Sequence, residues 1–348
     1  MQFRLRGSGL ARRFAAAGLA ALLLAGCGKQ QTPASNAGAP ASTLKVGLVF
    51  DIGGRGDKSF NDAAYAGLER ARHELGTENT TLEMGEGNDR EAAIRQLAAG
   101  GAQLVFGVGF LFSDDIKALA KEFPEVKFAC VDYTVNPGDT LPPNLVALKF
   151  REQEGSFLVG ALAALLSKSD RLGFVGGMEI PLIKKFEVGY RAGVLTVRPK
   201  AKVLVKYAGT TGAAFKDPTK GKELALAEYH DGADIIFHAS GSTGLGVFEA
   251  ARDLNKLAIG VDSDQYDEAP GHILTSMVKR VDTSVFDTIK EVKDGRWTGG
   301  VKEFGLKESG VTWVYDERNK ALIPDAVKAQ VDSLQAGIIS GRITVPSQ

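Results

Sequence analysis

Cysteine and histidine are scarce in this chain of 348 residues, which has two of the first and four of the second. Cys130 lies in an apolar run, where a lone thiol usually behaves as a small hydrophobic residue. The other cysteine, Cys27, stands beside the N-terminal segment, so we expect no disulfide, and no cysteine–histidine cluster has the spacing of a zinc site. Acidic and basic side chains balance at 42 each, so no net charge attracts nucleic acid. The composition therefore predicts no metal, no cofactor and no nucleic-acid partner.

Side-chain groupings typical of catalysis are also missing. The histidines are scattered along the sequence, and no serine stands in a nucleophile elbow. Asp51 and Asp57 do not form the dense aspartate cluster of a metal-dependent hydrolase. We therefore expect a binding protein and not an enzyme.

Residues 1–27 resemble a secretion signal and not a part of the fold. Four arginines precede an apolar run, Phe14 to Ala25, that is too short for a membrane span. The run ends in Leu24-Ala25-Gly26-Cys27, which is similar to a bacterial lipobox, so we expect Cys27 to be lipidated and to anchor the chain to a membrane. The alternative is a plain secretion signal with an accidental cysteine. Residues 28–43 are small and polar and predict a flexible tether.

The remaining residues, about 305, are enough for two domains. Short apolar runs alternate with helical patterns almost throughout, which predicts an α/β fold with parallel, doubly wound sheets. The expected strands are Leu44–Phe50, Gln103–Val108, Lys127–Val131, Leu145–Phe150, Arg171–Val175, Lys202–Tyr207, Asp234–His238, Leu257–Val261 and His272–Met277. The expected helices include Ala63–Leu75, Asn88–Ala99, Ser113–Phe123, Glu154–Leu166, Phe186–Val194, Gly221–Tyr229, Gly244–Leu254 and Ala326–Ile339.

The chain is expected to cross more than once between two lobes joined by a hinge, with a cleft between them. We assign residues 44–150 plus about 265–300 to the N-terminal lobe. The C-terminal lobe then takes about 151–264 plus about 301–345, where short strands are expected around the glycines of Phe304–Tyr315.

The segment from Asp51 to Asp62 is the most informative part of the sequence. A carboxylate follows an apolar strand, a glycine-rich loop comes next, and Ser59, Phe60 and Asn61 begin a helix. Ligands of open α/β sheets bind at such strand ends, and an aromatic face beside short polar side chains suits a flat, hydrogen-bonding ligand. The alternative is structural: Ser59 or Asn61 as a helix cap and Phe60 as a hydrophobic staple.

Two later strand ends offer further candidates. Gly107-Val108-Gly109-Phe110 leads to Ser113 and Asp114, although these two residues also suit the first turn of a helix. Phe186 follows another strand-end loop; it could be a core residue, or it could face Phe60 so that the two rings hold a planar group between them.

The glycines of the segment 240–246, which include Gly241, resemble a phosphate loop only weakly because no P-loop lysine is present. We favour a close approach of backbone N–H groups to a hydroxylated ligand. Asp262 and Lys279 follow two of the expected strands and could bind a pair of sugar hydroxyls, or could form a simple ion pair near the hinge.

Taken in order, several segments resemble the basic membrane protein family of bacterial lipoproteins, in its purine nucleoside receptor (PnrA-like) group. The segments are KVGLVFDIGGRGDKSFND, GVGF followed by Ser113-Asp114, NLVALKFREQEGSFLVG, GFVGGMEIPLIKKFEVGYRAG, ADIIFHASGSTGLGVFEAA, IGVDSDQ and LTSMVKRVD. The resemblance covers residues 44–345 and implies a type I periplasmic-binding fold. It also implies a substrate-binding protein, with an ABC permease and its ATPase subunits as partners.

The resemblance further implies which side chains bind the nucleoside. The matching positions are Asp51, Phe60, Asn61, Asp114, Phe186, Gly241, Asp262 and Lys279. By this comparison the two phenylalanines stack on the purine, Asn61 and Asp114 bond the base edge, and the others hold the ribose. The ligand would be adenosine, guanosine or inosine, with a sugar receptor of the same fold, or less favourably a nucleosidase, as the alternatives.

Overall fold

The computed structural model describes residues 43–84 and 89–348, and Thr43–Gln348 forms one compact unit. The predicted signal segment, the expected lipidation site Cys27 and all but the last residue of the tether lie outside the described residues. Within the described part, no helix has the length and apolar character that a membrane crossing requires.

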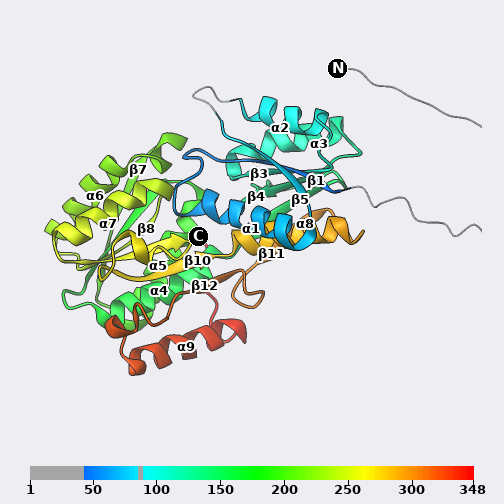
Figure 1. The fold of residues 1–348 in the computed structure, drawn as a ribbon. Helices are drawn as coiled ribbons and strands as arrows, with labels where there is room; N and C mark the ends of the chain where they lie inside the picture. The colour runs from blue at the N-terminus through cyan, green and yellow to red at the C-terminus, as the bar shows by residue number, and fades with distance from the viewer. Residues whose placement is uncertain (1–42, 85–88) are drawn as a thin grey trace, which may run out of the picture. The chain divides into compact units, whose positions relative to one another are not determined.

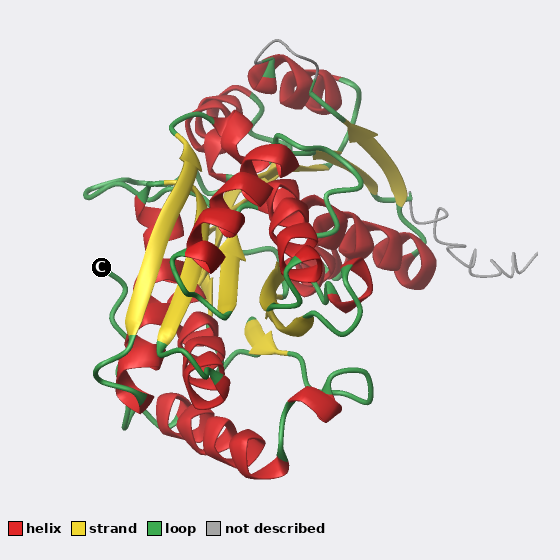
Figure 2. Ribbon diagram, turned by 90° about the vertical axis from the view of Figure 1, so that its left-hand side faces the viewer, coloured by secondary structure: helices red, strands yellow, loops and turns green. Residues whose placement is uncertain are grey.

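Two six-stranded sheets organise the unit (Figures 1 and 2). In sheet order, the first contains β11 (Gly300–Phe304), β5 (Leu145–Phe150), β4 (Lys127–Val131), β3 (Leu104–Val108), β1 (Lys45–Val49) and β2 (Glu78–Leu82). The second contains β12 (Val311–Trp313), β10 (Ile273–Lys279), β9 (Leu257–Asp262), β8 (Ile235–Ala239), β6 (Arg171–Met178) and β7 (Lys202–Gly209). All the pairings are parallel except that of β10 with β12.

Helices cover both faces of each sheet, which is why the central strands are continuous apolar runs. The first sheet packs between α1 (Phe60–Leu75) with α8 (Val281–Lys293) and α2 (Arg90–Ala99) with α3 (Ser113–Glu122). The second packs between α4 (Glu152–Leu166) with α5 (Pro181–Val197) and α6 (Pro218–His230) with α7 (Gly244–Asp253). The last helix, α9 (Asp325–Ile339), packs against α4. We call each sheet with its helices the first lobe and the second lobe.

Helices α4 and α5 lie unusually close together because glycines face the neighbouring backbone. A Cβ added at Gly160 would lie 2.2 Å from the carbonyl oxygen of Tyr190, and one at Gly193 would lie 2.0 Å from that of Phe157. Any larger residue at these positions would push the helices apart. The glycines of two of the sequence motifs noted above therefore serve helix packing.

The expected strands and helices are found within a few residues, and Cys130 is a buried, free thiol of β4. The expected lobe boundaries differ from the structure in two places. β10 lies inside the stretch assigned to the N-terminal lobe, but it pairs with β9 in the second sheet. β11 lies at the start of the stretch assigned to the C-terminal lobe, but it pairs with β5 in the first sheet.

The chain therefore crosses between the sheets after β5, after β10 and after β11. The reason is burial: β10 is buried on both faces and completes the interior of the second sheet, whereas β11 alternates exposed and half-buried residues and suits an edge.

Candidate functional site

A cavity lies where the carboxyl ends of strands from both sheets meet. Of the predicted site residues, those that line the cavity are Asp51, Phe60, Asn61, Phe186, Gly241, Asp262 and Lys279. The strand ends of the two sheets thus bring together residues that are far apart in the sequence.

Asp114 does not line the cavity. A short 3₁₀ turn, Phe110–Phe112, separates β3 from α3, so that Phe110 reaches the cavity while Asp114 stays exposed on the first turn of α3. A different carboxylate, Asp132, lines the cavity. Its signal was present in the sequence, since Asp132 directly follows buried strand β4 just as Asp262 ends β9.

Asp57 organises the loop that precedes α1. Its Oδ1 accepts hydrogen bonds from the backbone N–H groups of Ser59 and Asp62, at 3.0 and 3.1 Å. Its Oδ2 accepts from the backbone N–H and the side-chain Nδ2 of Asn61, at 2.8 and 3.1 Å. Asp57, and not Ser59 or Asn61, therefore provides the acceptor for the start of this helix.

The hydroxyl of Ser59 is consequently available to the other lobe. It donates to Oδ2 of Asp262 at 2.7 Å, and the hydroxyl of Ser263 donates to the carbonyl oxygen of Ser59 at 3.0 Å. These bonds join the start of α1 to the end of β9, residues that are about two hundred positions apart in the chain. Sequence reasoning gave no sign of this connection, because a local pattern does not show which strand end the start of α1 will face.

Asp51 and Asn61 are held side by side. The backbone N–H of Asp51 donates to Oδ1 of Asn61 at 2.8 Å, and Oδ1 of Asp51 accepts from the N–H of Ile52. The other carboxylate oxygen packs on Gly109, where an added Cβ would lie 2.0 Å from it. Burial raises the pKa of Asp51 to about 7, against the opposing effect of the Ile52 N–H.

Asp132 and Asp262 share an uncommon backbone conformation at their strand ends. Their φ angles are 62° and 64°, in the left-handed region that non-glycine residues rarely adopt. Such a conformation costs about 1–3 kcal/mol and is concentrated at functional sites. Burial also raises the pKa of Asp262 to about 6, although Lys279 and Ser59 act in the opposite direction.

Lys279 is the cation of the site and is only 1% exposed. Its Nζ lies 2.6 Å from Oδ1 of Asp132 and 3.1 Å from Oε1 of Glu152. The rings of Phe60, Phe150 and Phe186 lie 5.2, 5.0 and 5.7 Å from the ammonium. Burial alone would lower the pKa of Lys279, but the carboxylates outweigh it and raise the pKa, so this side chain is charged at neutral pH.

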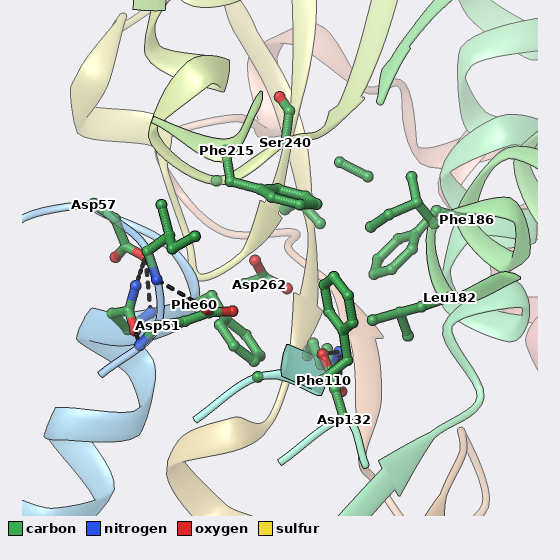
Figure 3. Close-up of a pocket in the computed structure, with 18 residues that line it drawn as sticks. Asp51, Asp57, Phe60, Phe110, Asp132, Leu182, Phe186, Phe215, Ser240 and Asp262 are labelled. Atoms are coloured by element: carbon green, nitrogen blue, oxygen red, sulfur yellow. Dashed lines mark hydrogen bonds and ion pairs between the residues drawn. The ribbon is translucent and has the colours of Figure 1, made fainter. Parts of the chain in front are cut away.

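Four phenylalanine rings surround the same space in Figure 3, two from each lobe. Phe60 and Phe110 come from the first lobe, and Phe186 and Phe215 come from the second. Phe110 and Phe215 meet edge to face, with their ring centres 6.5 Å apart. Phe110 and Phe215 were not among the predicted residues, because each lies on a short 3₁₀ turn after a strand and has no pattern of its own.

The site can hold a planar ligand that donates hydrogen bonds. The rings offer stacking faces, and Asp51 and Asp262 each keep an oxygen, Oδ2 and Oδ1, that accepts no hydrogen bond from the described residues. Among those residues, no three histidine, cysteine, aspartate or glutamate side chains are grouped as metal ligands.

Two α/β lobes with a pocket between their strand ends define a class of bilobal ligand-binding protein. Residues 44–348 match the family model described as ABC transporter substrate-binding protein PnrA-like, so the chain belongs to this family of ABC transporter substrate-binding proteins. The resemblance noted in the sequence is therefore confirmed.

Similar proteins support this assignment. A Lactococcus lactis protein named ABC transporter nucleoside-binding protein BmpA is 33% identical over 348 residues, which cover 94% of this chain and 95% of that protein. Basic membrane protein A of Borreliella afzelii is 37% identical over 306 residues, which cover 87% and 91%. The crystal structure of an ABC transporter system solute-binding protein from Aeropyrum pernix has a TM-score of 0.80 at 29% identity and covers 88% of this chain and 94% of its own. The expected type I periplasmic-binding fold agrees with this structural likeness.

Proposed function

We propose that this chain is a lipid-anchored receptor that binds purine nucleosides in the interlobe pocket and delivers them to an ABC importer. The observation that carries the proposal is the pocket itself, in which aromatic rings from both lobes surround two carboxylates with free acceptor oxygens. A purine offers a π face and a ribose offers hydroxyl donors, so one nucleoside fits both halves of this chemistry. The name of the Lactococcus lactis relative agrees with this ligand class.

In the proposed complex, Phe60 and Phe186 stack on the base and Asn61 bonds its edge. Gly241 and Asp262, with Asp51 and Lys279, hold the ribose. The structure adds residues for which the sequence made no assignment: Asp132, which pairs with Lys279, and Phe110 and Phe215, which face the same space. We propose binding without turnover, so that the ligand leaves unchanged.

Isothermal titration calorimetry of residues 28–348 tests the ligand class. Inosine, guanosine and adenosine should bind with micromolar or tighter affinity, whereas the free bases, which lack the ribose, should bind more weakly. Preferential binding of glucose or galactose would make the protein a sugar receptor instead. Release of hypoxanthine from bound inosine would make it a nucleosidase. Failure to bind any nucleoside contradicts the proposal.

The membrane anchor is a separate part of the proposal. Lipidation of Cys27 would anchor the protein to a bacterial membrane of the cell envelope, facing the periplasm, with the tether leading to the compact unit. Mass spectrometry of the N-terminal peptide from the membrane fraction should show a diacylglyceryl-modified cysteine. The Cys27→Ala variant should leave the membrane fraction, and an unmodified cysteine in the membrane-bound wild type would contradict the anchor.

A further inference from the structure

Glu152 is a buried carboxylate that the proposed binding site does not include. It belongs to the motif NLVALKFREQEGSFLVG and is the first residue of α4, directly after the chain crosses from β5 to the second lobe. Its side chain is 0% exposed, yet it does not line the cavity. An ionised side chain in such a place needs cationic partners.

Two lysines supply those partners, one from the site and one from α5. Oε1 of Glu152 lies 3.1 Å from Nζ of Lys279, and Oε2 accepts a hydrogen bond from Nζ of Lys185 at 3.0 Å. The same Lys185 ammonium donates to the carbonyl oxygen of Phe150, the last residue before the crossing. Burial raises the pKa of Glu152, but the two lysines outweigh it, so the pKa is lowered and the carboxylate is charged.

The contact between Glu152 and Lys279 lies within the second lobe. α4 packs directly on β10, where an added Cβ at Gly155 would lie 3.1 Å from the Met277 side chain. The contact between Lys279 and Asp132, in contrast, joins the second lobe to the first. Movement of the lobes would therefore break the contact with Asp132 and keep the contact with Glu152.

Lys279 has a flexible stem and three carboxylates within its reach, since Asp262 also acts on its charge. Without Glu152, only Asp132 and Asp262 would attract the ammonium, and both lie on the cavity side. Glu152 attracts the ammonium toward the start of α4, where the chain crosses between the lobes, and so limits the positions that the ammonium can take beside a ligand.

We propose that Glu152 is a positioning residue, which fixes the ammonium of Lys279 at the wall of the pocket and thereby sets the affinity for the ligand. This inference rests on the proposed function in taking a purine nucleoside as the ligand. It also gives the acidic motif at the start of α4 a role beyond helix packing.

A double-mutant cycle on the full compact unit tests the role. The chains are wild type, Glu152→Gln, Lys279→Met and the double variant, each titrated with inosine by calorimetry. Glu152→Gln keeps the shape but removes the charge, and it should weaken binding at least about tenfold, because it disturbs a buried charge pair. In the Lys279→Met background, the same substitution should change the affinity by less than about twofold, because its only route to the ligand is gone.

Glu187→Gln is the matched control. Glu187 is a buried carboxylate of α5 that contacts Lys184 and Arg191 at 2.8 and 3.2 Å, but it does not line the cavity or contact Lys279. It should lower the melting temperature without changing the affinity for inosine. Equal weakening by Glu152→Gln in both backgrounds, or equal weakening by the control, would overturn the positioning role.

Thermal unfolding of the same four chains without ligand keeps the inference separate from the proposed function. If Glu152 positions Lys279, the stability losses of the two single variants should be less than additive in the double variant. Failure of the wild type to bind any nucleoside would contradict the proposed function. The unfolding measurements would still show whether Glu152 and Lys279 interact. Additive losses would contradict the inference.

Discussion

Replacing Asp132 by asparagine should weaken ligand binding more than it weakens the fold. Nζ of Lys279 lies 2.6 and 2.7 Å from the two carboxylate oxygens of Asp132, and both side chains are buried. The pair joins the first lobe to the second at the wall of the cavity, so its loss should disturb the contact between the lobes where a ligand would bind. The asparagine has almost the same shape, so it tests the charge and not the packing.

The magnitude follows from the surroundings of the pair. Removing one partner of a buried, hydrogen-bonded charge pair costs about 2–5 kcal/mol. Lys279 retains Glu152 at 3.1 Å, so the ammonium is not left without a counter-charge. We therefore expect the lower part of that range, about 2–3 kcal/mol, which weakens binding roughly 30- to 160-fold.

Asp114→Asn is the matched control, because the sequence pointed to Asp114 and the structure to Asp132. Asp114 is exposed on α3 and does not line the cavity, so its substitution should change the binding free energy by less than about 0.5 kcal/mol. Calorimetry with inosine gives both affinities, and thermal unfolding shows whether either variant is damaged. Normal binding by Asp132→Asn, or a large loss for Asp114→Asn, would refute the reasoning from the structure.

The other predictions concern pH, stacking, the ribose contacts and an isolated buried acid. A ligand that donates hydrogen bonds needs Asp51 and Asp262 in their ionised form, and their pKa values are about 7 and 6. The affinity should therefore rise from pH 5 to pH 8. Calorimetry in several buffers should detect the release of protons on binding. Phe186→Ala should cost about 1–3 kcal/mol for adenosine and guanosine alike, whereas Asn61→Ala should change their ranking. Asp262→Ala should cost at least as much as Phe186→Ala, and normal binding with lower thermal stability would make Asp262 only an interlobe contact. Burial raises the pKa of Glu228 to about 9, so the folded state keeps a proton that the unfolded chain releases. Unfolding free energy should therefore fall as pH rises from about 5 to 9. Glu228→Gln should remove the part of this slope that Glu228 contributes, most clearly above pH 7, where Asp51 and Asp262 no longer add to it.

The regular elements were largely predictable, because their signal is local. Strands such as β4 and β5 are apolar runs that helices cover on both faces, and the observed bounds equal the expected ones. β2 was not expected, because Glu78–Leu82 is polar and sits half exposed at a sheet edge. The lobe boundaries failed at β10 and β11 for a related reason: the sequence shows that a segment is a strand, but the choice of sheet depends on which partners bury it.

The residues of the site likewise divide into those that the sequence predicted and those that it did not. Asp51, Phe60 and Asp262 were found from the sequence because each stands at a strand end or helix start, and the strand ends of an α/β sheet face a common edge. Asp132 also follows a strand, but the sequence analysis chose Asp114 instead, which is exposed on α3 and does not line the cavity.

By itself, the sequence determined the α/β class, the family and seven of the residues that line the pocket, since periodicity and motifs are properties of neighbouring residues. Only the tertiary structure decided which strand ends face one another, that Ser59 bonds Asp262 across the lobes, and that Lys279 stands between Asp132 and Glu152. These contacts join segments more than a hundred residues apart, and nothing in a local pattern encodes the packing that brings them within hydrogen-bonding distance.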